Sequence, residues 1–285
     1  MRYEERQPVA DLQPYIQCLW HLDRTYTAEA EGERLWPDGC FELIFHYGHA
    51  YVYQGQRLPR AFVIGSLTRW HGLQATGRVR LFGVRMKPWG LALLFQMQVQ
   101  DLKDVCFPMD EQEELNRNMQ VKECEAKLAE AEVEEAFACL QTRLLQVLAD
   151  RPPLQSSEAG MLASLSAMYE DPLVKDGQAM GRSSGYSVRH FERKCAQWTA
   201  LTPKKLRMVA RFNQVRMRIF REPSIDLHDC MHEFGYYDYA HFSKDFKECL
   251  GLTPLAYKEW LTGMISSFRK KDNHVAFLQD DSSPI

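Results

Sequence analysis

The chain has 285 residues, a formal net charge of −3 and 26% charged residues. That length predicts about two domains, and the composition is ordinary for soluble globular proteins. No run of ~18 apolar residues occurs, so no membrane-spanning helix is expected.

The termini and cysteines point to a cytoplasmic protein. The N-terminal residues lack the charged-then-apolar pattern of a signal peptide. The eight cysteines include no CxxC pair, and most stand among apolar residues. We therefore interpret them as reduced thiols of the protein core.

Residues 1–109 predict a β-rich domain. Short aromatic and β-branched runs such as CFELIFHYG, residues 40–48, are separated by glycines. The close spacing of strands and turns favours an antiparallel barrel or sandwich over βαβ units.

One set of residues in this domain combines aromatic walls with a few charges, as small-molecule pockets do. Its members are Trp36, Asp38, Glu42, Arg85 and Trp89. A structural interpretation is also open, in which Asp38-Gly39 forms a hairpin turn and Glu42 pairs with Arg85.

Histidines offer little support for a metal site. His46, His49 and His71 lack a Glu or further His at an obvious companion spacing, and a metal needs a matched set of three or four ligands. His228 and His232 stand at i and i+4, a spacing that can bind a metal, but no carboxylate or Cys clearly faces them, which favours a solvated helix face. We predict neither a metal nor a cofactor.

Residues 110–150 predict helices with an apolar stripe. The stripe repeats every seven residues: Met119, Ala126, Val133, Leu140 and Val147. It either forms a coiled-coil seam that dimerises the protein or packs as the inner face of helices on the β-rich domain. Pro152 and Pro153 then interrupt any helix, so residues 151–156 are interpreted as a linker.

Residues 157–262 predict an all-helical domain, most clearly in residues 224–260. There a short apolar stripe ends at Gly235, and a second helix is expected after Asp238, a side chain that caps the unpaired amides of a first turn. Thr253-Pro254 indicates the start of a further helix. Helix, turn and helix with a polar and basic outer face is typical of a helix-turn-helix DNA reader.

Residues 177–206 repeat this pattern, with a bend at Gly185-Tyr186 and a core residue at Phe191. A helix over residues 203–221 is expected to join the two units. At 1.5 Å per residue it spans about 28 Å, which suits the ~34 Å between successive major grooves on one face of DNA. Residues 175–221 hold twelve basic and two acidic residues, the charge pattern of a surface that lies along phosphates.

The run GYYDYAHFSKDFKECLGLTPLAY, residues 235–257, resembles the signature of AraC/XylS-type transcription regulators. LWPDGCFELIF (35–45) and GVRMKPWGLALLF (83–95) are similar to the N-terminal domain of one subgroup, which implies a cupin-like sensing or dimerising domain. The resemblance implies duplex DNA, RNA polymerase, a small-molecule effector and a second copy of the chain as partners. Cys195 stands where the family has Phe, and Ala200 where it has Gly, which predicts a less tightly packed first unit.

The predicted fold class is α+β with two domains: an antiparallel β-barrel or cupin-like domain with C-terminal helices, then an all-α tandem helix-turn-helix domain. The recognition helices are expected to enter adjacent major grooves. The side chains expected to contact bases are Arg189, Glu192, Arg193, Tyr239, Ser243 and Lys244. Those expected to contact phosphates are Ser187, His190, Lys205 and His241.

Two other classes of function stay open. One is a cupin-like enzyme that acts on a small molecule or metal and carries a DNA-binding module. The other is an interaction protein that recruits a partner through residues 110–135. The sequence contains no GxSxG, P-loop, dinucleotide fingerprint or HExxH motif, which favours a regulator without catalysis. In the tail, residues 263–285, the run HVAFLQ (274–279) either adds a strand to the N-terminal domain or is disordered.

Overall fold

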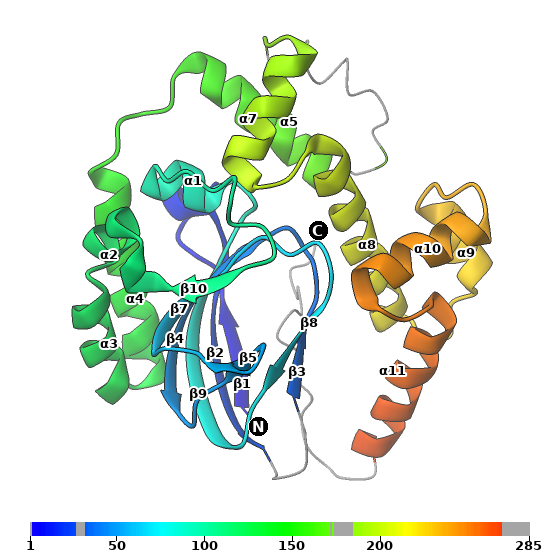
Figure 1. Ribbon diagram of the computed structural model, residues 1–285, viewed down its shortest axis with the longest axis horizontal. Helices are drawn as coiled ribbons and strands as arrows, with labels where there is room; N and C mark the ends of the chain where they lie inside the picture. The colour runs from blue at the N-terminus through cyan, green and yellow to red at the C-terminus, as the bar shows by residue number, and fades with distance from the viewer. Residues whose placement is uncertain (1, 27–31, 172, 174–184, 270–285) are drawn as a thin grey trace.

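The computed structural model describes residues 2–26, 32–171, 173 and 185–269. Two antiparallel sheets make up the N-terminal domain (Figure 1). The larger sheet has the order β1 (Arg2–Arg6), β2 (Ile16–Tyr26), β9 (Gly77–Met86), β4 (Phe41–Gly48), β7 (Ala61–Ile64) and β10 (Cys106–Pro108). The smaller has the order β3 (Gly32–Leu35), β8 (His71–Gln74), β5 (Val52–Tyr53) and β6 (Gln56–Arg57). Among the described residues no strand pairing closes these sheets into a barrel, so the antiparallel, two-sheet prediction is confirmed and the closed form is not found.

The central strands are buried on both faces, with strict alternation between two cores. On β4, Leu43 and Phe45 belong to the core beneath the helices, whereas Ile44 belongs to the core between the sheets. Val63 on β7 joins the first core, and its neighbour Phe62 joins the second. Because successive side chains of a strand point to opposite faces, near-continuous apolar runs such as FELIF supply both cores at once.

Helices of three to 17 residues cover one face of the larger sheet. They are η1 (Ala10–Leu12), α1 (Gly90–Phe95), η2 (Met109–Glu111), α2 (Glu113–Met119), α3 (Val121–Glu130) and α4 (Val133–Ala149). Figure 1 shows α2, α3 and α4 on the side of the sheets away from α9, α10 and α11.

The seven-residue stripe of residues 119–147 is divided among α2, α3 and α4. Gln120 has φ 48°, which ends α2, and Ala126 is exposed on α3. Met119, Val133 and Leu140 are buried against the N-terminal core. The stripe is therefore the inner face of packed helices, and the coiled-coil interpretation is wrong.

The C-terminal domain is helical, as predicted. Its described helices are α5 (Ser156–Glu170), α7 (Val188–Thr199), α8 (Pro203–Arg221), α9 (Leu227–Glu233), α10 (Tyr239–Leu250) and α11 (Pro254–Arg269). The joining helix α8 has the bounds that the sequence predicts. The expected start of the first repeat, residues 177–184, and the run at 274–279 lie outside the described residues.

The two domains pack directly on each other. The N-terminal core continues into the C-terminal domain through Trp198 of α7 and Leu206 of α8. Tyr169 Oη on α5 donates a hydrogen bond of 2.7 Å to the backbone oxygen of Asp38. None of the helices in the described part of the chain is long and apolar enough to cross a membrane.

Candidate DNA-binding surface and ligand pocket

The second helix-turn-helix unit is formed by α9 and α10. Gly235 in the turn has φ 67°, a left-handed conformation that glycine adopts without steric cost. Asp238 Oδ1 accepts a hydrogen bond of 2.7 Å from the amide of His241 and so caps α10. Phe242 and Phe246 are buried, while Lys244 is exposed. The polar face of α10 is thus presented to solvent.

Helix α10 is held in place by α8. Arg211 Nη2 on α8 lies 2.8 Å from Asp245 Oδ2 on α10, and the same guanidinium lies 3.9 Å from the ring centroid of Tyr236. Lys205 Nζ on α8 forms a second ion pair with Glu248 Oε1, at 2.6 Å. Lys205, expected at a phosphate, therefore also links the joining helix to the second recognition helix.

The first unit presents α7 in a similar way. The hydroxyl of Ser187 accepts a hydrogen bond of 3.3 Å from the amide of His190, which makes Ser187 the N-cap. Arg189, Glu192 and Arg193 are all exposed on one face of α7. The ring of His190 stacks on Tyr186 with centroids 4.3 Å apart. The three expected base contacts of this unit therefore lie together and face solvent.

Counting from the caps gives the register between the two units. Helix α7 begins at Val188 and α10 at Tyr239, directly after their N-caps. Tyr239 therefore matches Val188 and not Arg189, whereas Ser243 and Lys244 match Glu192 and Arg193. Tyr239 is half-buried, and its ring lies 5.8 Å from that of Phe242. Its contact with a base stays a prediction.

Sequence reasoning did not select Tyr237, which lies between the turn and the cap of α10. Its side chain is 91% exposed, the highest value among the exposed large hydrophobic residues. The sequence feature that could have pointed to Tyr237 is its position: it is an aromatic residue outside the apolar stripe and directly precedes the N-cap Asp238. Among the remaining predicted phosphate contacts, His241 is exposed, with Nε2 3.7 Å from Asp245 Oδ2.

The two family departures in the first unit have different outcomes. Cys195 is fully buried, and its Sγ lies 3.3 Å from the backbone oxygen of Leu201. Ala200 caps the C-terminus of α7 with φ 61°, whereas the matching Gly251 after α10 has φ 74°. A left-handed alanine is sterically strained, so the strain of this unit lies at Ala200.

We expect Ala200→Gly to stabilise the protein by about 0.5–1 kcal/mol, because glycine adopts the left-handed conformation without steric strain. Glycine also raises the conformational entropy of the unfolded chain, and this effect offsets only part of the stabilisation. Urea unfolding followed by circular dichroism measures the change. Ala196→Gly, inside the same helix, is the matched control and should cost about 1 kcal/mol. Destabilisation by both changes would contradict the assignment.

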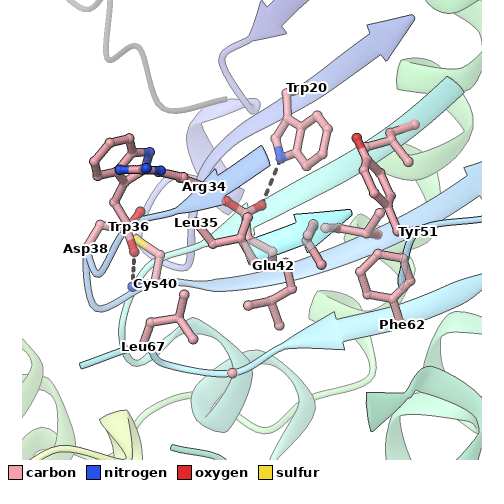
Figure 2. Close-up of a pocket in the computed structure, with 15 residues that line it drawn as sticks. Trp20, Arg34, Leu35, Trp36, Asp38, Cys40, Glu42, Tyr51, Phe62 and Leu67 are labelled. Carbon is pink, nitrogen blue, oxygen red and sulfur yellow. Dashed lines mark hydrogen bonds between the residues drawn. The ribbon is translucent and has the colours of Figure 1, made fainter. Parts of the chain in front are cut away.

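A pocket lies between the two sheets of the N-terminal domain (Figure 2). Trp36 and Asp38 lie at one end of its lining residues, and Tyr51 and Phe62 lie at the other. Between them, Glu42 Oε2 accepts a hydrogen bond of 2.8 Å from Trp20 Nε1. The free volume is about 30 Å³. The pocket is mainly apolar, with carboxylates at one side.

Arg85 organises these carboxylates. Its Nε lies 2.6 Å from Glu42 Oε1 and 4.0 Å from Asp38 Oδ2, and its Nη1 lies 3.8 Å from Glu5 Oε1. Burial raises the pKa of Glu42, and the charge of Arg85 opposes that rise. The structural interpretation, in which Glu42 pairs with Arg85, is confirmed.

The structure divides the five residues expected at the pocket between two cavities, because Asp38, Arg85 and Trp89 line a second cavity of about 620 Å³ together with residues of α5 and α8. Trp36, Asp38 and Glu42 line the pocket between the sheets, and Arg85 contacts it through Glu42. Trp89 lies elsewhere: its indole Nε1 donates to the backbone oxygen of Pro14 at 2.8 Å, and it does not line the pocket. The expected hairpin at Asp38-Gly39 is wrong, because β3 and β4 belong to different sheets.

The three histidines considered as metal ligands, His46, His49 and His71, have protein partners, with His49 Nδ1 3.3 Å from the backbone oxygen of Arg78. His46 Nε2 lies 2.6 Å from the backbone oxygen of His49, and His71 Nδ1 lies 2.8 Å from Tyr53 Oη. Across the described ranges, no group of three or more His, Cys, Asp or Glu residues is arranged to hold a metal.

Comparisons with known proteins match each domain to a family model. Residues 180–259 match the model of a helix-turn-helix domain family, and residues 4–108 match a domain of unknown function, DUF6597. Among solved structures, ToxT from Vibrio cholerae O395 is 10% identical with a TM-score of 0.45, covering 85% of this chain and 98% of its own. Unsaturated fatty acid bound wild-type ToxT from Vibrio cholerae strain SCE256 is 10% identical with a TM-score of 0.45, covering 92% and 99%. No curated protein matches the sequence.

Proposed function

We propose that this protein is a sequence-specific transcription regulator that binds duplex DNA. The premise is that residues 180–259 are a helix-turn-helix domain of the AraC/XylS type. The observation that carries the proposal is the pair of capped helices, α7 and α10, joined by the 19-residue helix α8. Each presents polar or basic side chains to solvent at matching positions. Two such helices suit neighbouring major grooves.

The contacts of α8 support a fixed spacing between the two readers. The ion pairs of Arg211 with Asp245 and of Lys205 with Glu248 attach α10 to α8. Because both units belong to one chain and follow each other in sequence, a single subunit should read an asymmetric site. Arginine at α7 suits guanine, and Lys244 suits either guanine or phosphate.

The N-terminal pocket supports control by a small molecule. Its lining is mainly apolar and lies between two sheets that pack directly on the C-terminal domain. We propose that the protein acts by binding and not by catalysis, in the cytoplasm. Contacts with RNA polymerase and with a second copy of the chain are further predictions of this proposal.

The decisive experiment is duplex selection followed by titration. Full-length protein is incubated with random duplexes, the bound fraction is sequenced, and affinity for the selected site is measured by fluorescence anisotropy. We expect an asymmetric motif with two conserved segments about one helical turn apart, and affinity that falls steeply with salt. The Lys122→Ala variant, on α3 beside Asp110 and Glu125, should bind with an unchanged salt slope. Absence of salt-sensitive affinity for any duplex would contradict the proposal.

A further inference from the structure

The pocket between the sheets is too small, as it stands, for an organic effector. Its free volume is about 30 Å³, and one water needs roughly 10–15 Å³ by the same kind of measure. Small-molecule sites are usually clefts of about 300–1,000 Å³. An effector can therefore enter only if one wall of the pocket moves.

Strand β3 forms the wall of the pocket whose displacement costs the least free energy. It is four residues long, lies at the edge of the smaller sheet and pairs with β8. The opposite wall includes β4, which pairs with β7 and β9 on its two sides. Because an edge strand has a ladder on one side, displacing β3 disrupts fewer backbone hydrogen bonds than displacing β4. Arg34 and Leu35 of β3 line the pocket directly.

The residue that follows β3 packs into the second helix-turn-helix unit. Trp36 is 7% exposed and belongs to the core cluster of that unit. Its ring centroid lies 6.0 Å from that of Tyr257 and 5.9 Å from that of Trp260, both on α11. The guanidinium of Arg216 on α8 lies 5.8 Å from the same ring. Trp36 thus contacts the pocket and the DNA-binding domain at once.

A second route runs from β3 to the end of the recognition helix. The guanidinium of Arg34 lies 5.4 Å from the ring centroid of Trp70. The indole of Trp70 lies against Gly251, the residue that ends α10, so closely that a Cβ at this position would overlap Trp70 Nε1. Both routes begin within three consecutive residues, 34–36.

We propose that β3 transmits occupancy of the pocket to the second helix-turn-helix unit. A largely apolar small molecule that enters between the sheets displaces β3, and Trp36 and Trp70 then lose their contacts with α11 and the end of α10. The second reader is held less firmly against the N-terminal domain. This inference rests on the proposed function only in taking the pocket as the effector site.

A cavity-filling substitution tests the inference without a ligand or an operator. In the full-length chain, Leu73→Phe on β8 adds a ring to the cavity beside β3, and amide hydrogen exchange is measured over residues 251–262. We expect exchange there to rise by about tenfold or more, because the packing that protects it is withdrawn. Trp36→Ala should produce a similar rise alone, and the double variant should exceed either single variant by no more than about twofold.

The matched control is Val84→Ile, which adds one methylene to the helix-covered core and leaves exchange at 251–262 unchanged. If circular dichroism shows that Leu73→Phe is unfolded, Leu81→Phe fills the same cavity from β9 and takes its place. The inference would be overturned if exchange became faster only within residues 32–86. It would also be overturned if Leu73→Phe and Trp36→Ala multiplied each other's effect on the exchange rate at residues 251–262. Salt-dependent duplex binding by the wild-type chain is measured separately, so failure here leaves the proposed function standing.

Discussion

Replacement of Arg85 by methionine is expected to lower the free energy of unfolding by about 3–5 kcal/mol. Arg85 is 3% exposed and provides the positive charge closest to Glu42. Methionine fills a similar volume, so the loss comes mainly from leaving a buried carboxylate without its partner. Urea or thermal unfolding of the full-length chain, followed by circular dichroism, measures the change.

The loss in free energy of unfolding caused by Arg85→Met should depend on pH. The pKa of Glu42 is already raised in the folded protein, and removal of Arg85 raises it further, since that guanidinium lowers it. A carboxyl whose pKa is raised by folding contributes stability below its unfolded pKa, about 4.3, and loses it as pH rises through the folded pKa. The variant should therefore be closest to wild type near pH 4.5 and furthest from it near pH 8.

Two further variants separate charge from packing. Lys87→Met removes a half-buried cation two residues away on the chain and should cost less than about 0.5 kcal/mol. Adding Glu42→Gln to Arg85→Met neutralises the orphaned carboxylate and should recover part of the loss at pH 8. If the stability loss of Arg85→Met did not depend on pH, or equalled that of Lys87→Met, Arg85 would have no role in stabilising the Glu42 carboxylate.

Replacement of Arg193 by alanine is expected to weaken binding to the selected duplex by about 1–3 kcal/mol, or roughly 5- to 150-fold. Arg193 is exposed on α7, so stability should stay within about 0.5 kcal/mol of wild type. A guanidinium that forks onto one guanine carries sequence information, and its loss should relax the preference at a single base pair. Anisotropy titrations against single-base variants of the site measure both effects.

Lys205→Ala provides the contrast to Arg193→Ala. If Lys205 contacts phosphate, its loss weakens all duplexes alike and flattens the salt slope by about one. Its ion pair with Glu248 adds a structural role, and Glu248→Gln removes that pair while the lysine stays. We expect Glu248→Gln to leave the base preference unchanged. Matching profiles for Arg193→Ala and Lys205→Ala would contradict the division between base and phosphate contacts.

Local chemistry made the C-terminal domain predictable. The caps at Asp238 and Thr253, the left-handed turn at Gly235 and the helix over residues 203–221 all appear where the sequence placed them. Each of these depends on hydrogen bonds and steric limits within about four residues of the chain. The Glu42–Arg85 pair was also within reach, because adjacent antiparallel strands bring opposite charges together.

The sequence by itself determined the two-domain organisation, with an antiparallel β-rich domain followed by paired helix-turn-helix units. This was possible because hydrophobic periodicity and helix capping depend on residues that are neighbours in the chain. Only the tertiary structure decided which segments meet: Trp36 packs on α11, Trp89 lies away from the pocket, and the stripe of residues 119–147 folds back on the sheet. Aromatic and apolar side chains are buried by any partner of suitable shape. Their partners are therefore set by how distant surfaces fit together, which no local pattern records.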